Sequence, residues 1–170
     1  MIEVKNLIKR YKKAEKNAID GVSFEILHPQ VAAYGRKLKP NALSCVVRVT
    51  DSHSGASALL AGDIEAAQEH ELVQSGQVLK ADWLLVPHHG SATSSTQAFL
   101  DVVQPDVAVV QAGYRNRFGH PRPEVLQRYT DSGVLVVQTP RCGASIWRSE
   151  QPNLVQCERN QRQRYWQHVL

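Results

Sequence analysis

The sequence contains few cysteines, and their spacing matches no common metal or disulfide motif. Cys45, Cys142 and Cys157 are odd in number, lie far apart along the chain and form no CxxC pair. This pattern argues against a disulfide framework or a zinc knuckle. We therefore expect the three residues to be free thiols or small buried apolar side chains.

Long apolar runs are also missing from the sequence. No stretch approaches the roughly 18 consecutive apolar residues that a membrane span requires. The first residues are rich in lysine and do not follow the pattern of a signal peptide. We therefore expect a soluble polypeptide.

The composition is that of a globular domain. The 170 residues are 42% hydrophobic and 21% charged, which is enough apolar side chain for one sizeable core and argues against wholesale disorder. The formal charge of +4 and the pI near 9.1 are compatible with a polyanionic partner but do not require one. Basic residues concentrate in the first 17 residues and between 159 and 164, where a solvated chain end is the simpler explanation.

Three regions differ in pattern along the chain. Residues 1–20 form a lysine-rich segment, residues 21–148 alternate predicted strands and helices, and residues 149–170 form a polar tail that we expect to be flexible. Apolar runs bounded by turn residues predict strands at 22–27, 43–50, 57–61, 83–86, 107–110, 134–137 and 144–147. Helices are expected over 64–72, from Ser94 or Ser95 to Val103, and over 122–130. This alternation predicts a layered α/β domain.

A carboxylate follows one of the predicted strands. Asp63 comes directly after Gly62, at the end of the apolar run 57–61. One interpretation makes Asp63 the N-cap of the helix expected over 64–72. The other makes it an oxygen ligand that bridges two divalent metal ions. The sequence leaves both interpretations open.

Two histidines end the next predicted strand. Pro87 stops the run 83–86, and His88 and His89 follow at its carboxyl end, where α/β proteins place ligands. On an extended strand, adjacent side chains point to opposite sides, so we expect only one imidazole to bind a metal ion. The other would hydrogen-bond a carboxylate or contact substrate. We favour His89 as the ligand.

Two polar loops lie near these histidines in the predicted layout. Ser91 and Ser94 belong to a hydroxyl-rich loop before a helix, where free amides favour phosphate, although ordinary helix capping explains them equally well. Asn116 and His120 follow the run 107–110 on the same rim of the sheet. His120 either contacts a phosphate or a leaving group, or belongs to a rigid Gly-His-Pro turn that starts the next helix.

Four segments together resemble a known family. They are Pro40–Val49, Leu59–Glu65, Ala81–Ser95 and Asn116–Pro121, and they occur in the order seen in the metallo-β-lactamase-like domain of ComEC proteins, the DNA-internalisation channels of competent bacteria. The resemblance covers about 21–148. It implies a four-layer αββα fold, of which this chain holds the C-terminal half. It also implies a two-metal site, with Zn or Mn, that hydrolyses phosphodiesters in DNA.

The resemblance assigns roles to three residues. Asp63 would be the bridging metal ligand, and His88-His89 would supply the histidine of the second half of the site. The resemblance also implies parent proteins of the inner or cytoplasmic membrane, with this domain outside the membrane. The family's first metal motif, His-x-His-x-Asp-His, does not occur in this sequence. We therefore expect the chain alone to be inactive or to bind metal weakly.

The first 26 residues resemble a different family. Ile2–Tyr11 and Ala18–Ile26 are similar to the opening strands of ABC transporter ATP-binding subunits, but no Walker A loop follows, so we expect no ATP binding. Both resemblances share Asp20–Glu25. We interpret that hexapeptide as the junction of a chimera.

The sequence thus supports two hypotheses of function. The first is a fragment of a metal-dependent nuclease domain associated with DNA uptake. The alternative is a non-catalytic basic module that binds nucleic acid or a protein. Half of an αββα sandwich would expose one sheet face, so we also expect self-association through that face, or partial disorder, unless residues 1–20 supply a substitute strand.

Overall fold

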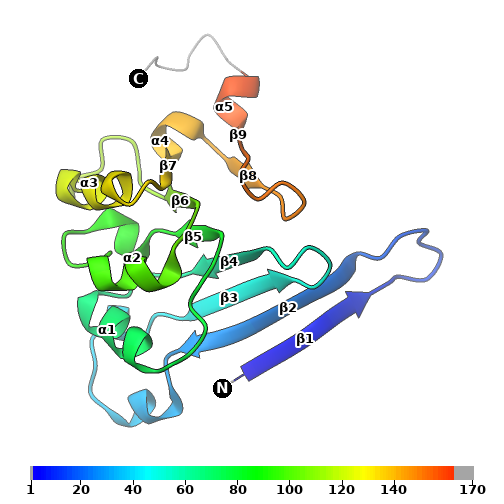
Figure 1. Cartoon of the computed structure of the whole chain (residues 1–170), viewed down its shortest axis with the longest axis horizontal. Coiled ribbons are helices and arrows are strands. Elements are labelled where there is room, and N and C mark those ends of the chain that lie inside the picture. Colours follow the sequence, from blue (N-terminus) through cyan, green and yellow to red (C-terminus); the bar gives the residue numbers. More distant parts are fainter. Residues whose placement is uncertain (1, 163–170) are drawn as a thin grey trace.

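The computed structural model describes residues 2–162 and shows a mixed α/β fold (Figure 1). Its main sheet contains seven strands in the order β1-β2-β3-β4-β5-β6-β7, so each strand pairs with the strand that follows it in sequence. The predicted α/β class is confirmed.

The first four strands form an antiparallel meander. They are β1 (Ile2–Lys9), β2 (Ile19–His28), β3 (Val46–Asp51) and β4 (Ser57–Leu60). The hairpin between β3 and β4 agrees with the turn predicted from Asp51 to Gly55. Short 3-10 turns at Val31–Gly35 and Pro40–Leu43 occupy the connection between β2 and β3.

The last strands of the sheet are parallel. β4 pairs with β5 (Trp83–Leu85), β5 with β6 (Val107–Val110), and β6 with β7 (Leu135–Gln138). Each parallel pair needs a crossover connection, which is supplied by α1 (Ala66–Gln74), α2 (Gln97–Val103) or α3 (Pro123–Asp131). The carboxyl ends of these strands therefore meet along one edge of the sheet.

The core lies between the sheet and these three helices. Alternate residues of the strands, such as Leu59 and Leu84, are fully buried together with Phe99 of α2 and Tyr129 of α3. The opposite face is covered in part by a two-stranded sheet of β8 (Ser145–Trp147) and β9 (Val155–Cys157). There Trp147 lies 6.4 Å from Trp83, between ring centroids. The strand predicted at 144–147 thus forms, but outside the main sheet.

Residues of the lysine-rich segment do supply a strand. β1 pairs with β2 from Ile2↔Ile26 to Lys9↔Ile19 and forms one edge of the sheet. Its apolar side chains bury little surface, since Ile2 is 61% exposed and Ile8 is 52% exposed. We expected self-association or partial disorder unless residues 1–20 supply a substitute strand. They do supply one, although this strand adds little to the core.

Two helices begin later than the sequence suggested. The N-cap of α1 is Glu65, whose side chain forms a capping box with Gln68. Asp63 is therefore not an N-cap, and that interpretation was wrong. The N-cap of α2 is Thr96, which accepts a hydrogen bond from Phe99 N, in place of Ser94 or Ser95. In both cases the preceding residues are used in turns that approach neighbouring segments.

The expectation of free cysteines was wrong for two of the three. Cys142, in α4 (Thr139–Cys142), and Cys157 form a disulfide. The β8–β9 hairpin turns the chain back, and the two Cα atoms lie 4.6 Å apart, within the range of disulfides. Cys45 is a free, exposed thiol.

The region expected as a polar tail contains regular structure as far as the described residues extend. β9 and α5 (Glu158–Gln161) lie within 149–162, and the rest of that region, 163–170, lies outside the described residues. Among the helices of residues 2–162, none has the length and apolar character of a membrane span.

Candidate functional site

A left-handed turn presents the two histidines at the edge of the sheet. Pro87 ends β5, and the 3-10 turn Pro87–Gly90 follows. His88, His89 and Gly90 have φ angles of 46°, 55° and 79°. The expectation of an extended backbone at these two residues was therefore wrong. The centroids of the two imidazole rings lie 6.5 Å apart. Consecutive left-handed residues other than glycine cost free energy and cluster at functional sites.

Close backbone packing holds this turn in place. His88 N donates to Gly62 O at 2.9 Å, which joins the turn to the end of β4. Arg122 N donates to Gly90 O at 2.9 Å and joins it to the start of α3. A Cβ atom at position 90 would lie 2.7 Å from Pro121 Cβ, so this position admits only glycine without rearrangement.

Asp63 and His89 face each other across the sheet edge. Asp63 Oδ1 lies 3.4 Å from His89 Nε2, and both side chains are about half exposed. His89 Nδ1 lies 2.7 Å from the carbonyl oxygen of Gln111. A carbonyl only accepts, so Nδ1 carries the proton, and in a neutral ring Nε2 turns its lone pair toward the carboxylate. Asp63 Oδ1 and His89 Nε2 are thus close enough either to form an ion pair when the ring is protonated or to bind one cation together.

His88 has different surroundings. Its Nε2 lies 3.3 Å from Asn41 Nδ2, which can only donate, so Nε2 is the acceptor and Nδ1 carries the proton. Nδ1 in turn lies 3.4 Å from Glu65 Oε1 and 3.4 Å from Thr93 Oγ1. Both nitrogens of His88 are therefore directed at protein groups.

The loop with Ser91 and Ser94 is closed by internal hydrogen bonds. Ser94 is buried, and its hydroxyl lies 2.8 Å from Pro87 O and 3.1 Å from Ser91 O. Ser91 Oγ lies 3.1 Å from Thr93 Oγ1. The hydroxyl of Ser94 thus holds the histidine turn to the start of α2.

The amides at the start of α2 are bound by an internal carboxylate. Fully buried Glu69 of α1 accepts from Ser95 N at 2.5 Å and from Thr96 N at 2.7 Å. Burial raises the pKa of Glu69, and the hydrogen bonds from these residues and the charge of Arg128 oppose that shift. The free amides that the sequence suggested for a phosphate are therefore taken up by Glu69 at these two positions.

Asn116 and His120 lie in one loop after β6. The Asn116 side chain donates to His120 O at 2.6 Å and accepts from His120 N at 3.0 Å, so it fixes the loop. The His120 ring lies 5.9 Å from the His88 ring, and its Nδ1 is buried without a partner among the described residues. Burial lowers the pKa of His120, and His88, Arg122 and His89 lower it further.

The structure brings five of the predicted residues to one rim: Asp63, His88, His89, Asn116 and His120. Sequence reasoning missed the roles of Asn41, Glu65 and Gln111. Glu65 could have been noticed because it follows Asp63 at a spacing of two residues. Gln111 acts through its backbone, so no side-chain pattern marks it.

The described residues do not provide a complete metal centre. Within residues 2–162, no group of three or more His, Cys, Asp or Glu side chains is placed to hold a metal ion. Asp63 and His89 offer two donors, whereas a catalytic zinc site uses three protein ligands and a water. No reaction step through a metal can therefore be assigned to these residues alone.

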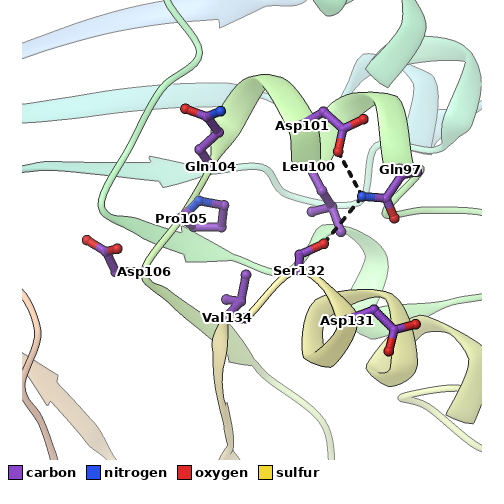
Figure 2. A pocket seen from close by; sticks show the side chains of 10 residues that line it. Gln97, Leu100, Asp101, Gln104, Pro105, Asp106, Asp131, Ser132 and Val134 are labelled. Carbon is purple, nitrogen blue, oxygen red and sulfur yellow. Dashed lines mark hydrogen bonds between the residues drawn. The ribbon is translucent and has the colours of Figure 1, made fainter.

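A cavity lies at the amino ends of the parallel strands. It has a volume of about 610 Å³ and is lined by residues that include Gln97, Asp101 and Asp106 (Figure 2). Gln97 Nε2 donates to Asp101 Oδ1 at 2.8 Å and to Ser132 Oγ at 3.3 Å. Because Asp106 precedes β6, this cavity lies at the amino ends of the strands, away from His88 and His89.

Several known proteins are similar in sequence to this chain. No protein-family model matches it. It is 38% identical over 126 residues to Competence protein ComA of Neisseria gonorrhoeae, covering 74% of this chain and 18% of that protein. It is 32% identical over 141 residues to ComE operon protein 3 of Bacillus subtilis (strain 168), covering 83% of this chain and 18% of that protein.

A third relative is Recombination protein 2 of Haemophilus influenzae, 37% identical over 108 residues, or 64% of this chain and 13% of that protein. The chain thus spans less than a fifth of the length of these relatives. It is similar to one segment of each of these proteins, two of which are named for competence or the ComE operon and one for recombination.

Proposed function

We propose that this chain is half of a metallo-β-lactamase-like phosphodiesterase domain that acts in DNA uptake. In this proposal, Asp63 and His89 are its contribution to a metal centre, and the remaining ligands come from outside this sequence. The observation that carries the proposal is the pair of acceptors, Asp63 Oδ1 and His89 Nε2, at 3.4 Å. A divalent cation is a natural partner for a carboxylate oxygen and a neutral imidazole nitrogen.

The neighbouring contacts support this division of roles. Gln111 O fixes the tautomer of His89 that leaves Nε2 available, in the way that partners of ligating histidines commonly do. His88, held between Asn41 and Glu65, would position the turn and contact substrate. A bound metal pair would activate water for attack on a phosphodiester.

The chain alone is expected to lack nuclease activity, because two donors are too few for a catalytic site. The test gives purified chain Mn²⁺ or Zn²⁺ and single-stranded DNA, and measures both cleavage and metal binding by titration calorimetry. We expect weak metal binding that Asp63→Ala abolishes and no cleavage. Asp101→Ala, in the cavity at the other end of the strands, is the matched control and should leave metal binding unchanged.

Two results would overturn parts of this proposal separately. Metal-dependent cleavage that is lost in Asp63→Ala would show that the chain is a complete enzyme. Equal metal affinity of the native chain and Asp63→Ala would remove Asp63 from the metal site.

A second candidate function is binding of nucleic acid without hydrolysis. The observation that favours it is the loop after β6, where Arg115 lies over the Tyr114 ring at 5.2 Å and Arg117 over the Phe118 ring at 4.9 Å. Basic and aromatic side chains together are typical of single-strand binding surfaces. Binding that weakens steeply with salt, without any cleavage, would support this function.

We further propose that the first 20 residues are joined to this domain from an unrelated gene. The low burial of β1 supports this, because Ile2 and Ile8 stay more than half exposed although the strand pairs with β2. Sequencing upstream of the Asp20 codon in the source genome tests the proposal. A His-x-His-x-Asp-His motif in frame there would support it, and the same uninterrupted order in several genomes would contradict it.

A further inference from the structure

A small apolar cavity lies beside the Asp63–His89 pair. It has a volume of about 230 Å³ and is lined by His89, Gln111, Ala112, Gly113, Asn116, Phe118 and His120. Sites for drug-sized molecules have volumes of roughly 300–1,000 Å³. This cavity is smaller and therefore suits a single ring system.

Aromatic rings form one wall of the cavity. The Phe118 and His120 rings are stacked, with centroids 5.9 Å apart and planes inclined by 16°. Phe118 is 58% exposed, so a ligand can reach much of its ring beside His120. Large exposed aromatic side chains of this kind are the usual platforms for nucleobases.

The charged residues of the loop after β6, which lines the cavity, are all basic. Residues 111–122 contain Arg115, Arg117 and Arg122 and no Asp or Glu. The guanidinium of Arg117 lies 4.9 Å from the centroid of the Phe118 ring. Asp63, across His89, is the carboxylate that faces the cavity's histidine wall. A ligand with an aromatic ring and an attached anion fits this arrangement.

Rigid loop geometry supports a preformed site. Asn116 bonds both backbone groups of His120, and His120 Nδ1 is buried without a partner among residues 2–162. A partnerless buried nitrogen is uncommon in a native structure and calls for an explanation such as a missing ligand or water.

We infer that this cavity binds one nucleobase of a single-stranded nucleic acid, which stacks on Phe118 while Arg117 binds the adjacent phosphate. The inference deepens the proposed function, on which it rests for its role, because a base held there places its phosphodiester near Asp63 and His89. Phe118 and Arg117 would be positioning residues, since neither belongs to the acceptor pair.

The test measures binding in EDTA, so that it does not depend on metal or on cleavage. The probe is a fluorescent 12-nucleotide pyrimidine DNA, compared with an abasic strand of the same length and charge. Because Phe118→Ala removes the ring on which the base stacks, we expect it to weaken binding of the pyrimidine strand at least about fivefold. Phe118→Trp should retain binding, and neither variant should change binding of the abasic strand.

The matched control is Tyr11→Ala. Tyr11 is also exposed, and Lys9 Nζ lies over its ring at 5.4 Å from the centroid. Tyr11 follows the edge strand β1, which four strands separate from β6 in the sheet. Tyr11→Ala should leave the affinity for the pyrimidine strand unchanged. Equal affinity of the native chain for the normal and abasic strands, or of Phe118→Ala and the native chain for the normal strand, would overturn the inference. Neither result would bear on metal binding at Asp63, which a separate titration measures.

Discussion

The carbonyl oxygen of Gln111 lies 2.7 Å from Nδ1 of His89 and thereby determines that Nε2 faces Asp63. In His88, one residue earlier, Nε2 accepts from Asn41, so it is the proton-bearing Nδ1 that faces a carboxylate, that of Glu65. Two adjacent histidines that look equivalent in the sequence therefore have distinct chemical roles in the structure.

This difference predicts unequal effects of two matched substitutions. Asparagine tolerates the left-handed conformation of both positions, so neither variant adds backbone strain. His89→Asn should lower Zn²⁺ affinity at least about tenfold, because losing one ligand of a weak site costs more than 1.4 kcal/mol. His88→Asn should change it much less. Titration calorimetry compares the two, and the reverse order would contradict our assignment of the ligand.

Glu69 is predicted to be a major contributor to stability. Glu69→Ala removes the acceptor of two amides at the start of α2 and should lower the free energy of unfolding by about 3 kcal/mol. Glu71→Ala is the control, because its ion pair with Arg36, at 3.7 Å, is exposed and such pairs contribute less than about 1 kcal/mol. Urea denaturation measures both. Equal effects would show that Glu69 does not hold the loop.

Glu69 also predicts a pH dependence of stability. Burial raises its pKa in the folded state, so the folded protein binds this proton more tightly than the unfolded chain. Its contribution is therefore fully present below the usual carboxyl pKa and is lost as pH rises through the raised folded value. Glu69→Gln should remove that part of the slope between the two pKa values. An unchanged slope in urea titrations at several pH values would contradict this prediction.

Gly90 is predicted to tolerate no side chain. Gly90→Ala places a Cβ atom 2.7 Å from Pro121 Cβ and adds the strain of a positive φ, so we expect a loss of about 3 kcal/mol. Gly76→Ala has a similar φ of +70° but no atom within 4 Å, and it should cost only about 1 kcal/mol. The difference between the two thermal or urea unfolding curves isolates the contact with Pro121.

The disulfide is predicted to stabilise the C-terminal segment. It closes a loop with a sequence separation of 15, for which the chain-entropy model gives about 3 kcal/mol. Cys142→Ser should therefore lower the unfolding temperature. A reducing agent should lower the unfolding temperature of the native chain but not that of the Cys142→Ser variant. Cys45→Ser is the control and should leave it unchanged, because Cys45 is unpaired. Identical curves with and without reductant would argue against the disulfide.

Much of the fold could be predicted from local sequence. The runs 57–61, 83–86 and 107–110 are short, apolar and bounded by turn residues, and the strands form within them. Pro123 and Gly133 bracket the helix predicted over 122–130, which forms as α3. Boundaries at caps were harder to predict. Ser94, Ser95 and Thr96 all satisfy the N-cap rule, so the sequence does not choose among them. Glu65 is not a preferred N-cap residue, and it caps α1 in place of Asp63 through its capping box with Gln68.

The sequence by itself indicated an α/β chain similar to a segment of competence proteins, with Asp63 and His88-His89 after the ends of neighbouring strands. Hydrophobic periodicity and the order of motifs are properties of the sequence itself, so they can be recognised without knowing any contacts. Only the tertiary structure decided which histidine nitrogen faces Asp63, which amides Glu69 accepts from and which cysteines pair. These outcomes depend on atoms brought together from distant residues, such as Gln111 O and His89 Nδ1, and no spacing along the chain encodes them.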